Sequence, residues 1–526
     1  MNDNLKGKFD YTARVLDRTD FCDLSDDYTL PDYMPAIGRV ISCTGVASPP
    51  ALYLGGGNLE FAGGVKYFLH YESAEDSSLW CAELPGEYDH LISADRIGNL
   101  PSEPSSLGGL VSGAVENVSV RVTGPRRLTV KSKIRLGMGI TSKASFETAF
   151  RGDVSRPDAI RYLNGSSPYG INSCGVSAPV VCRDRISAAE LHGSGNFRIV
   201  SARGKVMVNR LETLQNSLDC RGEINATVII VDEEENARPQ RLTRRIPFSA
   251  EIPLNTAADS GALSGTRAYG VCPSFIAVGD DDGISLEATL LVCGEAAFVK
   301  TFDYIRDVYS RAAECELSAT EFNIRVPIAC FNGNATVSAS TKCAGLGLDG
   351  GMKILDCRAE VLPTLEWEVK NNGKLALSGK MRLSLVADNG AELIPAEFES
   401  DFRYTADLQG ASELTSPRIS VVADIFDAKC RIDGENVYAD CELCVSILAE
   451  DERRISTVSE VNLIPEKETA PSASRIMVCY PCKGETLWDV ARRYRADAAG
   501  IAEKNSIEAG APDAPDSLAK SKFLII

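Results

Sequence analysis

The sequence predicts a mainly β protein in which three repeated antiparallel β-sandwich-like or barrel-like domains precede a small βααβ domain. Three observations predict this fold class. A block of residues centred on a glycine recurs three times, apolar residues alternate with polar ones between turn signals, and helical spacing begins only after residue 475. The chain has 526 residues, which is enough for three or four domains of ordinary size.

The recurring block begins with Leu, has Gly at its fifth position and continues as a β-rich stretch. It occurs at 59–71 (LEFAGGVKYFLHY), 218–230 (LDCRGEINATVII) and 375–387 (LALSGKMRLSLVA). The three glycines are Gly63, Gly222 and Gly379, at spacings of 159 and 157 residues. A glycine inside a strand favours a bulge or a bend where no side chain can be accommodated. We therefore expect these three glycines at equivalent positions in the fold.

Shorter blocks flank the glycine block in the same order each time. RVISC, RIVSA and KILDC precede it at 39–43, 198–202 and 353–357, and β-rich blocks follow it at 80–92, 242–254 and 398–408. Each copy closes on a strand, which is LTVKSKIRL from 128, ISLEATLLV from 284 or VYADCELCV from 437. Such regular self-similarity predicts three copies of one supersecondary unit. We place the repeated domains at residues 8–145, 178–304 and 323–465.

The closing strand of the first copy shows the alternation most clearly. Leu128, Val130 and Ile134 share one face, whereas Lys131 and Lys133 share the other, which is typical of a half-buried antiparallel strand. The turn signals GPRR at 124, GDDDG at 279 and IDGEN at 432 predict hairpins before the closing strands. The segments 146–177 and 305–322 are predicted as joints between copies, the second with a short helix.

The charge and hydropathy of the chain disfavour several classes of protein. It has 55 Lys and Arg against 73 Asp and Glu, a net charge of −18, which disfavours contact with nucleic acid or an anionic membrane surface. No apolar run approaches about 18 residues, so we expect no membrane insertion. The N-terminal residues lack the apolar stretch of a signal peptide, so we expect a cytoplasmic protein.

The seventeen cysteines are all expected to be thiols, because their number is odd, their spacing is scattered and the cytosol is reducing. Cys441 and Cys444 lie in a predicted strand, where a spacing of three points two side chains to opposite faces. Cys479 and Cys482 could approach each other, but no second Cys or His pair follows to complete a zinc site. The sequence therefore predicts no metal site.

No motif in the sequence indicates catalysis. The chain has only three histidines, and the lone G-x-G-x-x-G at 345–350 is followed by a predicted strand. A dinucleotide site would instead need a helix there, since the helix N-terminus holds the pyrophosphate. Acidic runs at 232–235 and 280–282 lie at predicted turns, where solvated acids are expected. We expect no catalytic residue and no cofactor.

A different unit follows a linker at residues 466–474 that is rich in Pro, Ser, Ala and charged residues. This C-terminal domain, at 475–526, is predicted to open with a strand at 477–481 and a helix whose capping box pairs Thr486 with Asp489. A second helix ends near Asn505, and a closing strand occupies 523–526.

Residues 477–526 resemble the LysM family. The matching positions are Gly484, Thr486, Leu487, Trp488, Ala491, Tyr494 and Asn505, while Glu485 stands where the family has Asp. The resemblance implies a groove, between the first turn and the loop after the second helix, that binds N-acetylglucosamine polymers such as peptidoglycan or chitin. The candidate binding residues are Gly484, Glu485, Thr486, Leu487, Asn505, Ser506 and Ile507. An alternative reading is that the first-turn residues only cap the helix.

Residues 8–465 resemble the repeated SPOCS domains of clostridial spore-coat proteins, and DYTLPDYMPAIGRVIS from residue 27 resembles the opening of such a domain. SPOCS repeats followed by LysM is the domain order of SipL-like proteins. The resemblance implies a non-enzymatic adaptor in the mother-cell cytosol, which binds the coat morphogenetic ATPase SpoIVA and anchors the spore coat at the forespore surface. Two alternatives stay open: a cell-wall protein that binds peptidoglycan through LysM, and an enzyme without a recognised motif.

Overall fold

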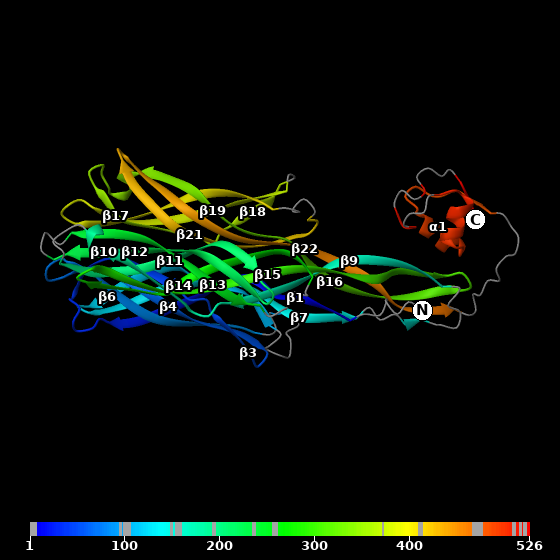
Figure 1. Cartoon of the computed structure of the whole chain (residues 1–526), viewed down its shortest axis with the longest axis horizontal. Helices are drawn as coiled ribbons and strands as arrows, with labels where there is room; N and C mark the ends of the chain where they lie inside the picture. The colour runs from blue at the N-terminus through cyan, green and yellow to red at the C-terminus, as the bar shows by residue number, and fades with distance from the viewer. Residues whose placement is uncertain are drawn as a thin grey trace.

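The computed structural model describes residues 8–93, 97, 107–147, 151–152, 160–191, 196–233, 238–254, 261–370, 373–408, 414–464, 477–507, 512–514, 518 and 523–526. Within these residues the chain is mainly β, in antiparallel sheets, with two short α-helices near the C terminus. The strands form an elongated body, and the helices lie at one end of its long axis (Figure 1). In the described part, no helix is both long and apolar enough to cross a membrane.

The strands of the body fall into three sets, β1–β7, β9–β15 and β16–β22, here called the first, second and third β units. Each unit contains one sheet built on its long closing strand, called its long sheet. The strand orders are β1-β7-β6, β10-β15-β14 with β9 also on β15, and β16-β22-β21 with β8 also on β22. The bounds are β1 (Lys8–Thr29), β6 (Leu107–Gly124), β7 (Arg127–Glu147), β8 (Arg151–Gly152), β9 (Ile160–Val176), β10 (Val180–Ser187), β14 (Ala262–Asp280), β15 (Gly283–Ser310), β16 (Glu314–Lys342), β21 (Pro417–Asp433) and β22 (Asn436–Ile464).

A second sheet in each unit, called its short sheet, is built on the strand that carries the recurring glycine. The central strands are β4, β12 and β19 in the first, second and third units. On one edge they pair with β5, β13 and β20, respectively. On the other edge β4 pairs with β2 and β3, β12 pairs with β11, and β19 pairs with β17 and β18. The bounds are β2 (Ile37–Ala47), β3 (Ala51–Gly55), β4 (Asn58–Ser73), β5 (Leu79–Ile92), β11 (Phe197–Thr213), β12 (Ser217–Asp232), β13 (Pro239–Pro253), β17 (Lys353–Val361), β18 (Glu366–Val369), β19 (Lys374–Asp388) and β20 (Leu393–Asp407).

The recurring glycine lies opposite an aromatic residue of the neighbouring strand in all three short sheets. The pairs are Gly63 with Tyr88, Gly222 with Phe248, and Gly379 with Phe402. A Cβ atom on these glycines would lie 2.5, 2.8 and 3.0 Å from the respective ring. Glycine is therefore required at these positions so that the ring can lie over the strand.

A β-bulge also recurs at one place in each short sheet. The register against the central strand shifts between Val40 and Ser42, between Ile199 and Ser201, and between Ile354 and Asp356. The extra residues are Ile41, Val200 and Leu355. A bulge redirects side chains locally, and these three side chains pack in one apolar cluster where the short sheets of the three units meet.

Each unit buries its main core between its long and short sheets. In the first unit, Ile134 of β7 packs in one cluster with Phe61 and Leu69 of β4, and all three are fully buried. The second and third units have equivalent clusters between β15 and β12 and between β22 and β19. Since each buried Leu, Ile or Phe contributes about 1.5–3 kcal/mol, these cores supply most of the stabilisation of each unit.

Polar contacts connect each of the three units to the other two. His70 of the first unit is hydrogen bonded to Ser201 of the second over 2.9 Å, and Arg203 donates to Asp356 of the third over 2.7 Å. Arg358 of the third unit donates to Thr44 of the first, which closes the ring of contacts. The three units therefore pack against one another as one body and are not separate domains joined only by linkers.

Local predictions of turns and strands agree with this structure. The hairpins close between Gly124 and Arg127, between Asp280 and Gly283, and between Asp433 and Asn436. In residues 128–136 the apolar positions are buried and the basic ones are not. The G-x-G-x-x-G segment begins inside a 3-10 turn at Cys343–Leu346 and is followed by strand β17, without the helix that a dinucleotide site needs.

The helix predicted in the second joint is wrong, and the described residues of both predicted joints are largely strand. Residues 160–176 form strand β9, which pairs with β15 along its length, and residues 305–310 continue β15 instead of forming a helix. The strand wins over helix because Ile305 and Val308 are β-branched and gain a partner strand and a buried apolar cluster. The paired residues of β9 and β15 lie 117 to 150 residues apart, so local spacing does not reveal this pairing.

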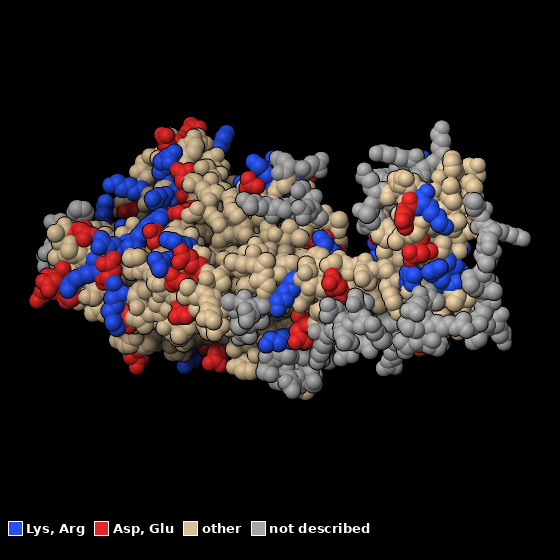
Figure 2. Space-filling view, turned by 45° about the vertical axis from the view of Figure 1, so that its right-hand side comes forward, with Lys and Arg blue, Asp and Glu red and all other residues tan. Residues whose placement is uncertain are grey.

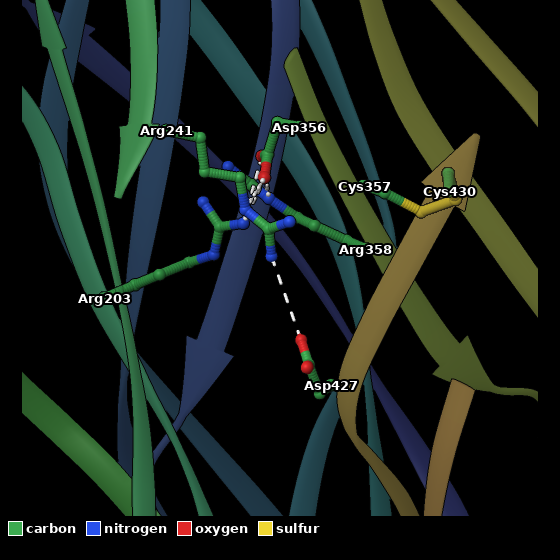
Figure 3. The surroundings of a disulfide bond; sticks show 7 residues. All are labelled: Arg203, Arg241, Asp356, Cys357, Arg358, Asp427 and Cys430. Carbon is green, nitrogen blue, oxygen red and sulfur yellow. Dashed lines mark hydrogen bonds and ion pairs between the residues drawn. A yellow bond between two sulfur atoms is a disulfide. The ribbon is translucent and has the colours of Figure 1, made fainter. Parts of the chain in front are cut away.

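The expectation that all cysteines are thiols is wrong for one pair. Cys357 of β17 and Cys430 of β21 form a disulfide, with Cα atoms 6.0 Å apart, that links the short sheet of the third unit to its long sheet (Figure 3). The sandwich brings these strands face to face, which the separation of 73 residues does not reveal. The other fifteen cysteines are free, and Cys441 and Cys444 lie on opposite faces of β22, one in the core and the other at a cavity.

Candidate functional site in the C-terminal unit

The C-terminal unit has a strand, two helices and a strand in that order. Strand β23 (Val478–Cys479) pairs antiparallel with β24 (Leu524–Ile525), and helices α1 (Leu487–Tyr494) and α2 (Ala498–Lys504) pack against them. A compact core holds the elements together, and its members are Cys479, Leu487, Trp488, Val490, Ala491, Ile501, Leu518 and Leu524. The unit contains the seven candidate binding residues, each of which has a defined place.

The first turn is shaped by Gly484 and Thr486. Gly484 has a φ of +84°, a left-handed conformation that glycine adopts without strain. Thr486 caps α1: its hydroxyl accepts from Asp489 N at 3.2 Å, while Asp489 Oδ2 accepts from Thr486 N at 2.9 Å. The hydrogen bond from the Thr486 hydroxyl is the largest contribution that lowers the pKa of Asp489. The predicted capping box is confirmed.

Glu485 and Leu487 are largely withdrawn from the surface. The Glu485 carboxylate accepts from Cys482 N at 2.8 Å and from Arg493 at 3.1 Å, and its side chain is only 12% exposed. Leu487 is 5% exposed and packs in the core. Glu485 therefore stabilises the turn and Leu487 stabilises the core of the unit, so neither side chain is free to contact a ligand.

The residues after α2 also make internal contacts. Asn505 donates to the carbonyl oxygens of Ile501 and Ile525, both at 2.8 Å, and its Oδ1 accepts from Ile525 N at 2.7 Å. Its amide thus fastens β24 to the end of α2. Ser506 has a φ of +53°, and half-buried Ile507 packs against the same core as Leu487. The structure therefore brings Leu487 and Ile507 together through the core of the unit.

One side of the C-terminal unit is bound to the β body through residues of β15 that the sequence analysis did not single out. Asp307 of β15 accepts from Trp488 Nε1 at 2.8 Å and from Arg492 at 2.7 Å. The Tyr309 hydroxyl donates to Ala496 O at 2.6 Å, and its ring contacts Trp488 at a centroid distance of 4.8 Å. These contacts cover part of α1, so Trp488 serves both the core and this interface.

Another side of the unit exposes large apolar side chains. Tyr480 is 73% exposed, Phe523 52%, Val478 50% and Met477 45%. All four lie within or next to β23 and β24. On the face visible in Figure 2, acidic and basic side chains of the unit lie side by side, so the charge of the unit is mixed there rather than of one sign. An apolar group of this size on a small unit is typical of a protein contact surface.

The described residues contain no cluster of three or more His, Cys, Asp or Glu side chains that could hold a metal ion. Comparison with known proteins identifies no relative: no family model, no curated protein and no solved structure matches this chain.

Proposed function

We propose that this chain is a non-enzymatic scaffold in spore-coat assembly that uses its C-terminal unit to dock a coat morphogenetic protein of the SpoIVA type at the forespore surface. In this proposal the three β units are copies of one SPOCS-like domain, and residues 475–526 are a LysM-like domain. The shared strand order, the shared bulge and the glycine–aromatic pairs support the repeat. In this proposal the second copy begins at residue 160 and the third at residue 314, where strands β9 and β16 start.

The observation that carries the proposal is the way in which the C-terminal unit is presented. One side is held by Asp307 and Tyr309 at the end of the elongated body, while the apolar side chains around β23 and β24 stay exposed. A rigid support with one open contact surface is what a docking module needs, because little order is lost when the partner binds. Glycan recognition is less well supported, since the Asn505 amide is already fully engaged within the unit.

The docking surface is centred on Tyr480 and Phe523, with the first turn at Gly484–Glu485 beside Tyr480 in sequence. Aromatic side chains provide most of the binding energy in protein interfaces when a partner pocket encloses them. Since both rings are exposed, their replacement leaves the core of the unit intact. This separates them from Leu487, whose removal would damage the fold.

Binding of the full chain to a purified SpoIVA-type ATPase tests the proposal. The double variant Tyr480→Ala, Phe523→Ser is expected to bind at least about tenfold more weakly. Tyr33→Ala is the matched control, because Tyr33 is a 79% exposed tyrosine of the first β unit. Equal binding by the double variant and the wild type, together with tight binding of chitin oligomers or peptidoglycan by the wild type, would replace docking by the glycan-binding alternative.

A further inference from the structure

A cavity of about 280 Å³ lies where the three β units meet. Its walls come from β2 and β6 of the first unit, β11 and β14 of the second, and β17 and β21 of the third. Unlike the cores of the units, this space is lined by many charged side chains. They are Glu116, Arg135, Arg203, Lys205, Arg241, Arg358, Glu360, Asp424 and Asp427.

Three guanidinium groups at one wall share a single buried carboxylate. Asp356 accepts hydrogen bonds from Arg203 Nη2 at 2.7 Å and from Arg358 Nε at 3.0 Å, and Arg241 Nε lies 3.4 Å from Asp356 Oδ1 (Figure 3). Arg203 Nη1 and Arg241 Nε are buried and make no hydrogen bond. These three arginines, called the arginine cluster, therefore have more donors than the protein satisfies.

The remaining charges of the cavity are engaged elsewhere. Asp427 lies 3.9 Å from Arg241, but it also lies 3.8 Å from both Arg245 and Lys429. Across the cavity, Asp424 pairs with Lys205 at 2.8 Å and Glu116 with Arg135 at 3.1 Å. Burial raises the pKa of Glu360, which favours its neutral form. Asp356 is thus the main counter-charge of three cations.

The titration of neighbouring groups reflects this excess of positive charge. Burial, and after it the charge of Arg358, lowers the pKa of Arg203 to about 10. Burial lowers the pKa of His70 to about 3, and the charges of Arg358 and Arg203 add to that effect. Buried cations whose charge lowers the pKa of Arg203 are stabilised by a further anion.

We propose that the arginine cluster of Arg203, Arg241 and Arg358 binds a small oxoanion at the wall of the central cavity. The planar guanidinium fork matches the geometry of a tetrahedral oxoanion, to which it donates two parallel hydrogen bonds. The cavity volume is ample for inorganic phosphate or sulfate. Because the cluster comes from β11 and β13 of the second unit and β17 of the third, the bound anion links these two units.

Calorimetric titration and thermal unfolding of the full chain with inorganic phosphate, at constant ionic strength set by chloride, test this proposal. Saturable binding with a concentration-dependent rise in the unfolding temperature is expected. Arg203→Gln and Arg241→Gln should each weaken binding at least about tenfold. Arg135→Gln is the matched control, because Arg135 lines the same cavity but pairs with Glu116, and it should bind phosphate like the wild type.

The outcomes separate clearly. Arg241→Gln keeps the pair between Arg203 and Asp356, so it provides the measurement if Arg203→Gln does not fold. Absence of saturable phosphate binding by the wild type, or equal binding by the wild type and a folded cluster variant, would refute the site.

Discussion

The second and third β units differ at two equivalent positions, one on the short sheet and one on the long sheet. In the third unit the disulfide joins Cys357, which pairs with Leu385 six residues after Gly379, to Cys430 on the long sheet. In the second unit Ala202 pairs with Val228, six residues after Gly222, and Ala277 takes the place of Cys430. The second unit nevertheless has a complete core between its two sheets. The architecture therefore forms through its apolar faces, and the disulfide is an addition to one unit.

A similar difference appears at the recurring glycine. A Cβ on Gly222 would lie 1.9 Å from the carbonyl oxygen of Met207, whereas a Cβ on Gly63 would meet only the ring of Tyr88. A backbone atom cannot move aside as a ring can. The second unit thus tolerates less change at its glycine than the first, although both glycines oppose an aromatic residue.

The largest expected effect is that of Gly222→Ala. We expect a loss of about 3 kcal/mol or more in the free energy of unfolding, because the new methyl group overlaps both the backbone and the ring of Phe248. Gly63→Ala should lose clearly less, since the Tyr88 ring can shift. Urea denaturation followed by circular dichroism measures both variants. Equal losses would contradict the difference between the two units.

The next effect concerns the disulfide. Replacing Cys357 and Cys430 by Ala, the residues of the second unit, is expected to lower stability by about 2–4 kcal/mol under oxidising conditions, since the bond closes a long loop. A reductant should destabilise the wild type by a comparable amount and leave the double variant unchanged. Cys43→Ala, at the equivalent position of the first unit, is the control and should keep the wild-type response to reductant. If the reductant does not change the unfolding midpoint of the wild type, the disulfide does not stabilise the fold.

The parts of the fold that local sequence predicts are those with local causes. Neighbouring residues alone predict the hairpin turns at 124, 279 and 432 and the alternation at 128–136. Strand β9 was missed because its stability comes from pairing with β15, and its own residues, rich in Gly and Ser, do not alternate. The link between Cys357 and Cys430 was missed for the same reason, since it depends on how two sheets stack.

The candidate site divides in the same way. The capping box of Thr486 and Asp489 follows from residues three apart, and the structure contains it. Conversely, spacing does not show whether Leu487 is a surface contact residue or a core residue, and the structure places it in the core. Spacing also does not show whether the Asn505 amide binds a ligand, and in the structure it is hydrogen bonded to strand β24. The contact of Asp307 with Trp488 joins residues 181 apart, and no local signal announces it.

A smaller effect is expected at that contact, which involves the closing strand of the second unit. Asp307→Ala should loosen the attachment of the C-terminal unit, because Trp488 Nε1 and Arg492 lose a shared acceptor worth about 1–3 kcal/mol. Small-angle scattering should show a larger radius of gyration, with unchanged β content. Asp303→Ala, an exposed aspartate of the same strand, should leave the scattering unchanged. An unaltered radius for Asp307→Ala would contradict the docked arrangement.

The smallest effect arises where the units differ in ionisation. The seventh residue after the recurring glycine is His70 in the first unit, Ile229 in the second and Val386 in the third. His70 is 4% exposed and hydrogen bonded to Ser201, in a place that the other units fill with apolar side chains. At this position, therefore, only the first unit carries a titratable group.

His70 should make the stability of the body fall with pH below about 6.5. Its pKa is lowered to about 3 in the folded chain, so between that value and the ordinary histidine pKa the unfolded chain binds the proton and the folded chain does not. The stabilisation is thus complete above about pH 6.5, and about 1.4 kcal/mol of it is lost at pH 5.5. His70→Val, which copies the third unit, should remove this part of the pH dependence in urea denaturation at pH 7.5 and 5.5. His90→Gln should retain it, because His90 instead faces Asp20 on the first unit. If His70→Val keeps the full wild-type difference between the two pH values, the proton is taken up elsewhere and the inner face of the first unit is not its source.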